Sequence, residues 1–108
     1  MPAKTKKVKK GQKVFIAPSF SSTQMRELKE QSQLLKPIVI IGDAGLTEAV
    51  IAEIERALYD HELIKIRLAY NDSDLRTKIT ANICDTTCST LIQNIGHVIT
   101  IYRKNAEE

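Results

Sequence analysis

The chain has 108 residues, of which 43% are hydrophobic, and this is enough apolar content to bury the core of one domain. No apolar run approaches the roughly 18 residues that a membrane-spanning helix needs. The apolar run Val14–Ala17, which follows the first lysines, is too short for the core of a signal peptide. We therefore expect a cytoplasmic protein that has no membrane partner.

The net charge of +3 hides a strong asymmetry along the chain. Residues 1–36 carry nine basic and two acidic residues, whereas residues 37–108 carry seven basic and eleven acidic ones. A basic leading segment on a mildly acidic body suggests a polyanionic partner that is approached from one side. A solubilising tail is the simpler alternative, and composition leaves the two interpretations evenly balanced.

The composition divides the chain into three parts. Residues 1–22 are predicted to be a disordered basic tail, because their first 13 residues hold six lysines and no acidic residue and the rest show no periodicity. Residues 23–104 are predicted to form one domain, and residues 105–108 a short C-terminal tail.

The first half of the domain predicts a helix, a strand and a second helix. A helix over about 24–34, with Thr23 as its N-cap, ends before a proline. Ile38–Ile41 is a continuous β-branched run, which indicates a strand covered on both faces. A second helix over about 47–60 begins at a capping threonine, Thr47. Its apolar stripe consists of Val50, Ile51, Ile54, Ala57 and Leu58.

The segment Leu63–Tyr70 alternates between apolar and basic positions. Lys65 and Arg67 share one side, so the pattern predicts a strand with a basic solvent face or a basic edge. The apolar positions of the other side are Ile64, Ile66 and Leu68.

A third helix begins at 71–73, and two strands follow over 90–95 and 98–102. The strands are separated by Gly96 and His97, which predicts a hairpin with a type II′ turn. The element order is αβαβαββ, so the first two strands should be parallel and the hairpin antiparallel. The predicted fold is a two-layer α/β domain with a four-stranded mixed sheet.

Between the first strand and the second helix lies a Gly-x-x-Gly sequence, Gly42 to Gly45. A strand, a glycine turn and a helix N-terminus in this order can present backbone N–H groups to a phosphate. Gly42 can adopt a positive φ that ends the strand, and Gly45 lets backbone approach a ligand. The motif alone is more often a structural turn. It lacks the Lys-Ser/Thr of a P-loop and the third glycine of a dinucleotide fingerprint, which argues against a nucleotide-dependent enzyme.

No catalytic or metal-binding constellation is visible in the sequence. His61 suits the C-terminal end of a helix, and His97 is expected to be an exposed hairpin residue. Cys84 and Cys88 are expected to be half-buried free thiols, and they could supply at most two of the four ligands of a structural zinc. We therefore expect no enzymatic activity, no metal and no cofactor.

Three segments together resemble a known family. They are Leu34–Val50 (LLKPIVIIG-x-x-GLTE-x-V), His61–Ile66 (HELIKI) and Ile95–Arg103 (IGH-x-I-x-IYR). They closely resemble the bacterial YhbY family, the stand-alone form of the CRM RNA-binding domain, over about residues 24–104. The resemblance implies a fold similar to the C-terminal domain of translation initiation factor three. It also implies RNA binding through the Gly-x-x-Gly loop and a neighbouring basic surface, in precursors of the large ribosomal subunit.

The resemblance places the loop at Gly42–Gly45, with Lys36 before the first strand, Lys65 in the second strand and Arg103 in the last motif. Asp43 departs from the family pattern, which often has a basic or neutral residue there, and a carboxylate at that position would repel phosphate. The predicted RNA-binding residues are Gly42, Asp43, Ala44, Gly45, Arg26, Lys29, Lys36, Lys65, Arg67, Arg103 and Lys104.

Our hypothesis from the sequence is a monomeric RNA-binding protein that acts in assembly of the large ribosomal subunit. The expected partner is ribosomal RNA, with no small-molecule substrate. The alternative is a protein-interaction module of the same fold that docks on a ribosomal protein. A small-molecule phosphate binder or enzyme is a distant third, because the sequence offers no base or nucleophile for it.

Overall fold

The computed structural model describes residues 20–105. Their elements are α1 (Ser22–Ser32), β1 (Pro37–Ile41), α2 (Glu48–His61), β2 (Leu63–Leu68), α3 (Ser73–Thr87), β3 (Thr90–Ile95) and β4 (Val98–Tyr102). The αβαβαββ order confirms the prediction. The two predicted tails, 1–22 and 105–108, lie almost entirely outside the described residues.

The four strands form one mixed sheet in the order β1-β2-β4-β3. β1 pairs with β2 in parallel, whereas β4 pairs with β2 and with β3 in antiparallel fashion. Arg67, near the end of β2, lies opposite Val98 at the start of β4. The C-terminal ends of β1 and β2 therefore share one end of the sheet with the β3–β4 hairpin, and we call this the loop end.

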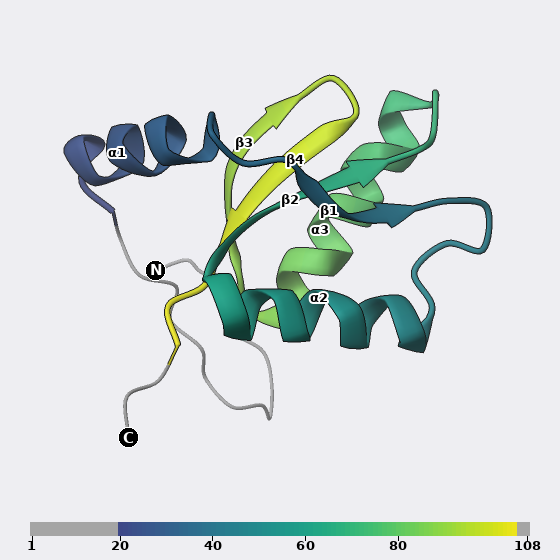
Figure 1. Cartoon of the computed structure of the whole chain (residues 1–108). Coiled ribbons are helices and arrows are strands. Elements are labelled where there is room, and N and C mark those ends of the chain that lie inside the picture. The colour runs from purple at the N-terminus through teal and green to yellow at the C-terminus, as the bar shows by residue number, and fades with distance from the viewer. Residues whose placement is uncertain (1–19, 106–108) are drawn as a thin grey trace, which may run out of the picture.

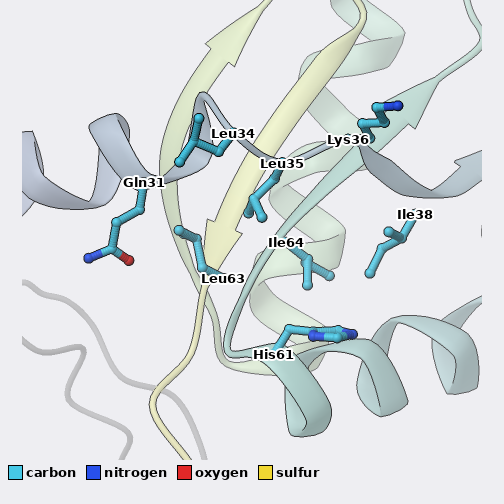
Figure 2. Close-up of a pocket in the computed structure, with 8 residues that line it drawn as sticks. All are labelled: Gln31, Leu34, Leu35, Lys36, Ile38, His61, Leu63 and Ile64. Carbon is cyan, nitrogen blue, oxygen red and sulfur yellow. The ribbon is translucent and has the colours of Figure 1, made fainter.

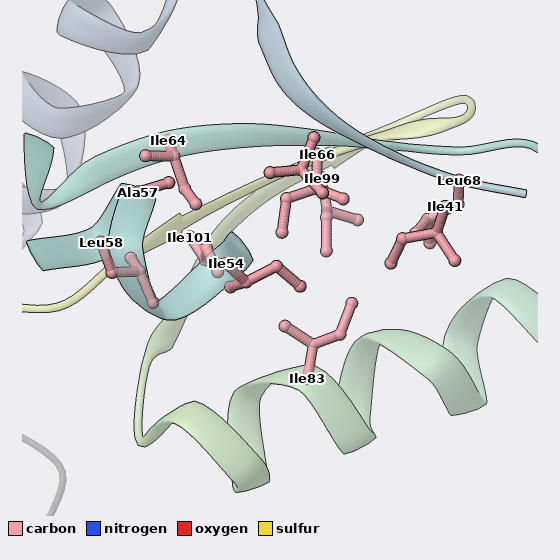
Figure 3. Close-up of a cluster of buried hydrophobic side chains, with 11 residues drawn as sticks. Ile41, Ile54, Ala57, Leu58, Ile64, Ile66, Leu68, Ile83, Ile99 and Ile101 are labelled. Atoms are coloured by element: carbon pink, nitrogen blue, oxygen red, sulfur yellow. The ribbon is translucent and has the colours of Figure 1, made fainter. Parts of the chain in front are cut away.

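The main core lies between the sheet and helices α2 and α3 (Figures 1 and 3). Ile54 of α2 and Ile83 of α3 are fully buried against the apolar side of β2, whose alternation the sequence predicted correctly. α1 lies on the other side of the sheet, where it contacts β2 and β3 (Figure 1). The core side chains are Val39, Ile41, Ile54, Ala57, Leu58, Ile64, Ile66, Leu68, Ile83, Ile99 and Ile101.

The N-terminus of α1 is fixed by Ser21 and not by Thr23, so the predicted cap is wrong. The Ser21 hydroxyl accepts from the Gln24 backbone N–H at 3.1 Å, and the Gln24 side chain accepts from the Ser21 N–H at 2.9 Å. A serine followed three residues later by glutamine allows this reciprocal capping box. Thr23 has no such partner within the helix.

The other two helices begin at side-chain caps. The hydroxyl of Thr47 accepts from the Val50 N–H at 3.2 Å, which confirms Thr47 as the cap of α2. Asp72 caps α3, which ends at Cys88 in a left-handed conformation with φ 56°. Cys84 and Cys88 are free and half-buried, as predicted, and burial raises the pKa of the Cys84 thiol.

β1 is exposed on one face, so the prediction of a strand covered on both faces is wrong. Ile38 is 49% and Ile40 is 63% exposed, whereas Val39 and Ile41 are buried. Ile40 lies opposite Arg67 on the side of the sheet away from α2 and α3, where the helices leave it exposed. Ile38 stands at the register shift between Pro37 and Val39 and lines a hollow beside His61 of α2 (Figure 2). A run of β-branched residues indicates a strand but does not show its place in the sheet.

Candidate nucleic-acid interface

The Gly42–Gly45 loop joins the end of β1 to the start of α2. The Gly45 N–H donates to the Gly42 carbonyl at 2.9 Å, and the Thr47 N–H donates to the Gly45 carbonyl at 3.1 Å. Gly45 has φ +78°, in the left-handed region that favours glycine, and Gly42 does not lie there. The expectation that Gly42 takes the positive φ is therefore wrong, because the turn is closed by its last residue.

A tyrosine from a distant segment anchors this loop. The Tyr70 hydroxyl donates to the Gly42 carbonyl, which thereby receives two donors. Asp43 and Ala44 are exposed, and their backbone N–H groups have no acceptor among residues 20–105. The anchored carbonyl and the two free N–H groups make a loop that can meet an anion through its backbone.

Two further basic side chains lie at the loop end of the sheet. The Arg76 Nη1 donates to the Tyr70 carbonyl at 2.6 Å and lies 3.4 Å from the Nε2 of His97. The His97 carbonyl accepts from the Leu68 N–H at 2.7 Å. His97 is half-buried and not exposed as predicted, because these contacts hold the hairpin tip against β2 and α3.

Lys65 and Arg67 project from β2 on the side away from α2 and α3. Arg67 is exposed and lies between Ile40 of β1 and Val98 of β4 in the sheet register. Lys65 is half-buried one pleat closer to the start of the strand. The predicted basic face of β2 is confirmed, and it faces solvent on a central strand rather than on an edge.

The remaining predicted cations fall into two groups. Lys36 points away from α2 (Figure 2), and Arg26 and Lys29 are exposed on α1, which lies on the same side of the sheet as the basic side chains of β2. Arg103 and Lys104 lie at the other end of the sheet, because they follow β4 where β2 begins. We call Lys65, Arg67 and Lys36 together the basic face.

Arg103 is already occupied by protein contacts. Its Nη1 donates to the Glu55 carboxylate at 2.8 Å and to the Thr87 carbonyl at 2.9 Å. Its backbone N–H donates to the Glu62 carbonyl at 2.9 Å. The structure therefore does not bring Arg103 to the loop, and it gives this residue a role in joining elements.

A family model described as the CRS1 / YhbY (CRM) domain matches residues 20–103. The chain belongs to this family. A probable RNA-binding protein of Pseudomonas aeruginosa is 42% identical over 87 residues, which cover 81% of this chain and 84% of that protein. An RNA-binding protein of Haemophilus influenzae is 40% identical over 89 residues, which cover 82% and 90% of the two chains.

A solved structure shows the same CRM-type fold. It is the solution structure of a hypothetical protein of Staphylococcus aureus, described as a candidate RNA-binding protein, with a TM-score of 0.70 and 32% identity. The match covers 82% of this chain and 93% of that one. The family and fold predicted from the sequence are confirmed, and the names of these CRM relatives describe RNA binding and no enzymatic activity.

An apolar hollow of about 370 Å³ lies beside the connection between α1 and β1 (Figure 2). Leu34 is 89% exposed at its rim, and Ile38 lines its wall. His61, which the sequence placed just after the helix and which is the last residue of α2, also lines it. The full lining is Gln31, Leu34, Leu35, Lys36, Ile38, His61, Leu63 and Ile64.

Within residues 20–105, no group of three or more metal-ligating side chains is placed to hold an ion. Over the same residues, every helix is too short or too polar to cross a membrane.

Sequence reasoning missed Tyr70 and Arg76 as residues of the loop end. Tyr70 follows a strand and Arg76 lies in the first turns of a helix, so neither stands out locally. Their importance comes from contacts with residues 28 and 21 positions away along the chain. The sequence offers no local pattern that would have identified them.

Proposed function

We propose that this protein binds RNA through the basic face and the Gly42–Gly45 loop. The observation that carries the proposal is the combination of two cations and a loop. Half-buried Lys65 and exposed Arg67 lie on the side of β2 away from the main core, and the Asp43 and Ala44 N–H groups have no acceptor within residues 20–105. The RNA-binding names of CRM relatives at 42% and 40% identity support it.

The geometry suits recognition of the RNA backbone. The free loop N–H groups would donate to one phosphate, while the ammonium of Lys65 and the guanidinium of Arg67 would neutralise others. Ile40, exposed beside Arg67, offers an apolar contact for a ribose. Tyr102 of β4 is on the same side of the sheet, but it lies at the end away from the loop and packs against Phe20. Shape and backbone should therefore dominate over stacking on bases.

We propose that the RNA is ribosomal RNA in precursors of the large subunit, and that the protein assists assembly in the cytoplasm as a monomer. The family resemblance supports this target. Crosslinking in cells followed by sequencing of the bound RNA should show enrichment of large-subunit ribosomal RNA. An unenriched profile would argue against the target while leaving general RNA binding intact.

A double substitution, Lys65→Gln with Arg67→Gln, tests the surface. RNA affinity measured across a salt series should fall, and the dependence of log K on log[salt] should flatten by about 1.4–1.8, since each phosphate contact contributes about 0.7–0.9. Arg56→Gln is the matched control, because Arg56 is exposed on α2 and its partner within residues 20–105 is Asp60, four residues on. An unchanged salt slope in the double variant contradicts the proposed surface.

The alternative function, docking on a ribosomal protein, is favoured by one observation. The hollow beside β1 is lined mainly by apolar side chains and has exposed leucines at its rim. Co-sedimentation with ribosomal particles distinguishes the two functions. Nuclease treatment should release an RNA-binding protein from the particles, whereas a protein that docks on another protein should stay attached.

A further inference from the structure

Arg76 is a half-buried cation that has no carboxylate partner within the described part of the chain. The ion pairs within residues 20–105 are Arg56–Asp60 and Arg103–Glu55. Arg76 instead contacts a carbonyl oxygen and an imidazole nitrogen, neither of which carries a formal negative charge in this arrangement. A guanidinium stays charged in proteins, so its positive charge at the loop end is not neutralised by these contacts.

The contacts of Arg76 leave one edge of the guanidinium available. Both use Nη1, which donates to the Tyr70 carbonyl and approaches the Nε2 of His97. No acceptor for Nε or Nη2 is present among the described side chains and backbone. These two nitrogens form the edge that fits two oxygens of a phosphate in a bidentate contact.

The same tyrosine holds both Arg76 and the loop. The hydroxyl of Tyr70 anchors the Gly42 carbonyl, and its own carbonyl accepts from Arg76. The position of the guanidinium relative to the loop is therefore set through one residue. His97 fixes it from the other side, and its own backbone is held by the Leu68 N–H.

We propose that Arg76 is a phosphate-binding residue for the RNA backbone at the loop end, and that Tyr70 and His97 position it. This inference rests on the proposed RNA binding and adds to it a cation from α3 that lies outside the basic face.

The test uses the full chain, a fluorescently labelled RNA hairpin and a salt series. Arg76→Gln should weaken binding about tenfold near 0.1 M salt and reduce the salt slope by about 0.7–0.9. Arg76→Lys should keep the slope but bind more weakly than the native protein, because an ammonium lacks the bidentate edge. Lys78→Gln, an exposed residue two positions along α3, is the matched control and should bind as the native protein does.

The outcomes separate this inference from the proposed function. Suppose that the native protein binds the RNA hairpin and that the Lys65/Arg67 double variant binds it more weakly. If Arg76→Gln then keeps the native affinity and salt slope, the inference is wrong and the proposed function stands. If the native protein does not bind RNA, the proposed function itself fails.

Circular dichroism and thermal melting show whether Arg76→Gln is folded. If it is not, NMR of the native protein decides instead. The Arg76 Nε–H resonance should move when the hairpin is added, and an unmoved resonance in a protein that binds the hairpin overturns the inference. Inorganic phosphate, added at the same concentration of phosphate groups, should move the Arg76 resonance less than the RNA does. If inorganic phosphate binds at Arg76 and RNA does not displace it, the assignment of the site to RNA is overturned.

Discussion

The two glycines of the loop differ in what they contribute. Gly45 adopts φ +78°, whereas a Cβ on Gly42 would meet no atom within 4 Å and its φ is not positive. We expect Gly45→Ala to lower the free energy of unfolding by about 1–2 kcal/mol, because a side chain in the left-handed region is strained. Gly42→Ala should cost much less. Urea denaturation of the two variants measures the difference.

Equal losses of stability in the two alanine variants would show that the strain is not located at Gly45. The contact with Tyr70 does not confuse the comparison, since a Cβ on Gly45 would lie 3.9 Å from the Tyr70 hydroxyl, an ordinary contact distance. The experiment therefore reports on backbone conformation.

Tyr70→Phe removes the hydroxyl that anchors the Gly42 carbonyl and leaves the ring in place. The expected loss of stability is about 0.5–1.5 kcal/mol, the usual net value of one hydrogen bond. Because the loop would also be less constrained, RNA affinity should fall even at temperatures where the variant is fully folded. Binding assays well below the melting temperature check this, and native affinity in a destabilised variant would limit Tyr70 to a structural role.

At the residue scale, the sequence predicted those site residues that belong to a local pattern. Alternation along β2 identified Lys65 and Arg67, and the motif identified the loop. Tyr70 and Arg76 were missed because their partners, Gly42 and His97, lie far away in the chain. The contact of Arg103 with Glu55, 48 residues away, was equally invisible.

At the scale of elements, Arg103 joins the end of β4 to both helices of the main core. Its side chain is 22% exposed and contacts Glu55 of α2 and the Thr87 carbonyl at the end of α3. We expect Arg103→Ala to lower the free energy of unfolding by about 1.5–3 kcal/mol, the range for hydrogen bonds to charged groups. Arg56→Ala breaks an exposed pair with Asp60 and should cost less than about 1 kcal/mol.

The RNA-binding behaviour of Arg103→Ala decides whether Arg103 also contacts RNA. If its role is to join elements, the salt slope of binding should be unchanged at temperatures where the variant is folded. A slope reduced by about 0.7–0.9 would restore Arg103 to the binding surface.

The order of helices and strands was predicted correctly, whereas the burial of the side chains of β1 was not. Strands and helices follow from periodicity and capping within short windows, which is why the order was correct. The cover over β1 depends on which helices pack against each side of the sheet. Ile40 is exposed because no described helix covers it beside Arg67, and Ile38 is exposed at a register shift beside the apolar hollow.

At the scale of the whole molecule, charge is distributed unevenly along the chain. Residues 1–13 hold six lysines and no acidic residue, and they precede the domain that carries the basic face. Changing these lysines to glutamine should lower affinity by a similar factor for unrelated RNAs, because contacts to phosphate carry no sequence information. Salt-dependent binding to two RNAs of different sequence measures this, and a loss confined to one of them would contradict it. The lysines are Lys4, Lys6, Lys7, Lys9, Lys10 and Lys13.

The family could be identified from the sequence because its three motifs are spread over nearly the whole domain and appear in the right order. The arrangement of the site could be predicted only in part. The loop end is assembled from the β1–α2 connection, the segment after β2, the start of α3 and the hairpin tip. Only a folded chain brings those four segments together.

The alternation along β2 places residues with two different roles, core packing and surface charge, within one strand of six residues. Ile64, Ile66 and Leu68 are buried in the main core, whereas half-buried Lys65 and exposed Arg67 lie on the other side of the strand, outside that core. Mutations at the outward positions can therefore accumulate, or be introduced by design, with little effect on folding. This strand is the natural place to change which ligand the scaffold prefers, in evolution or in the laboratory.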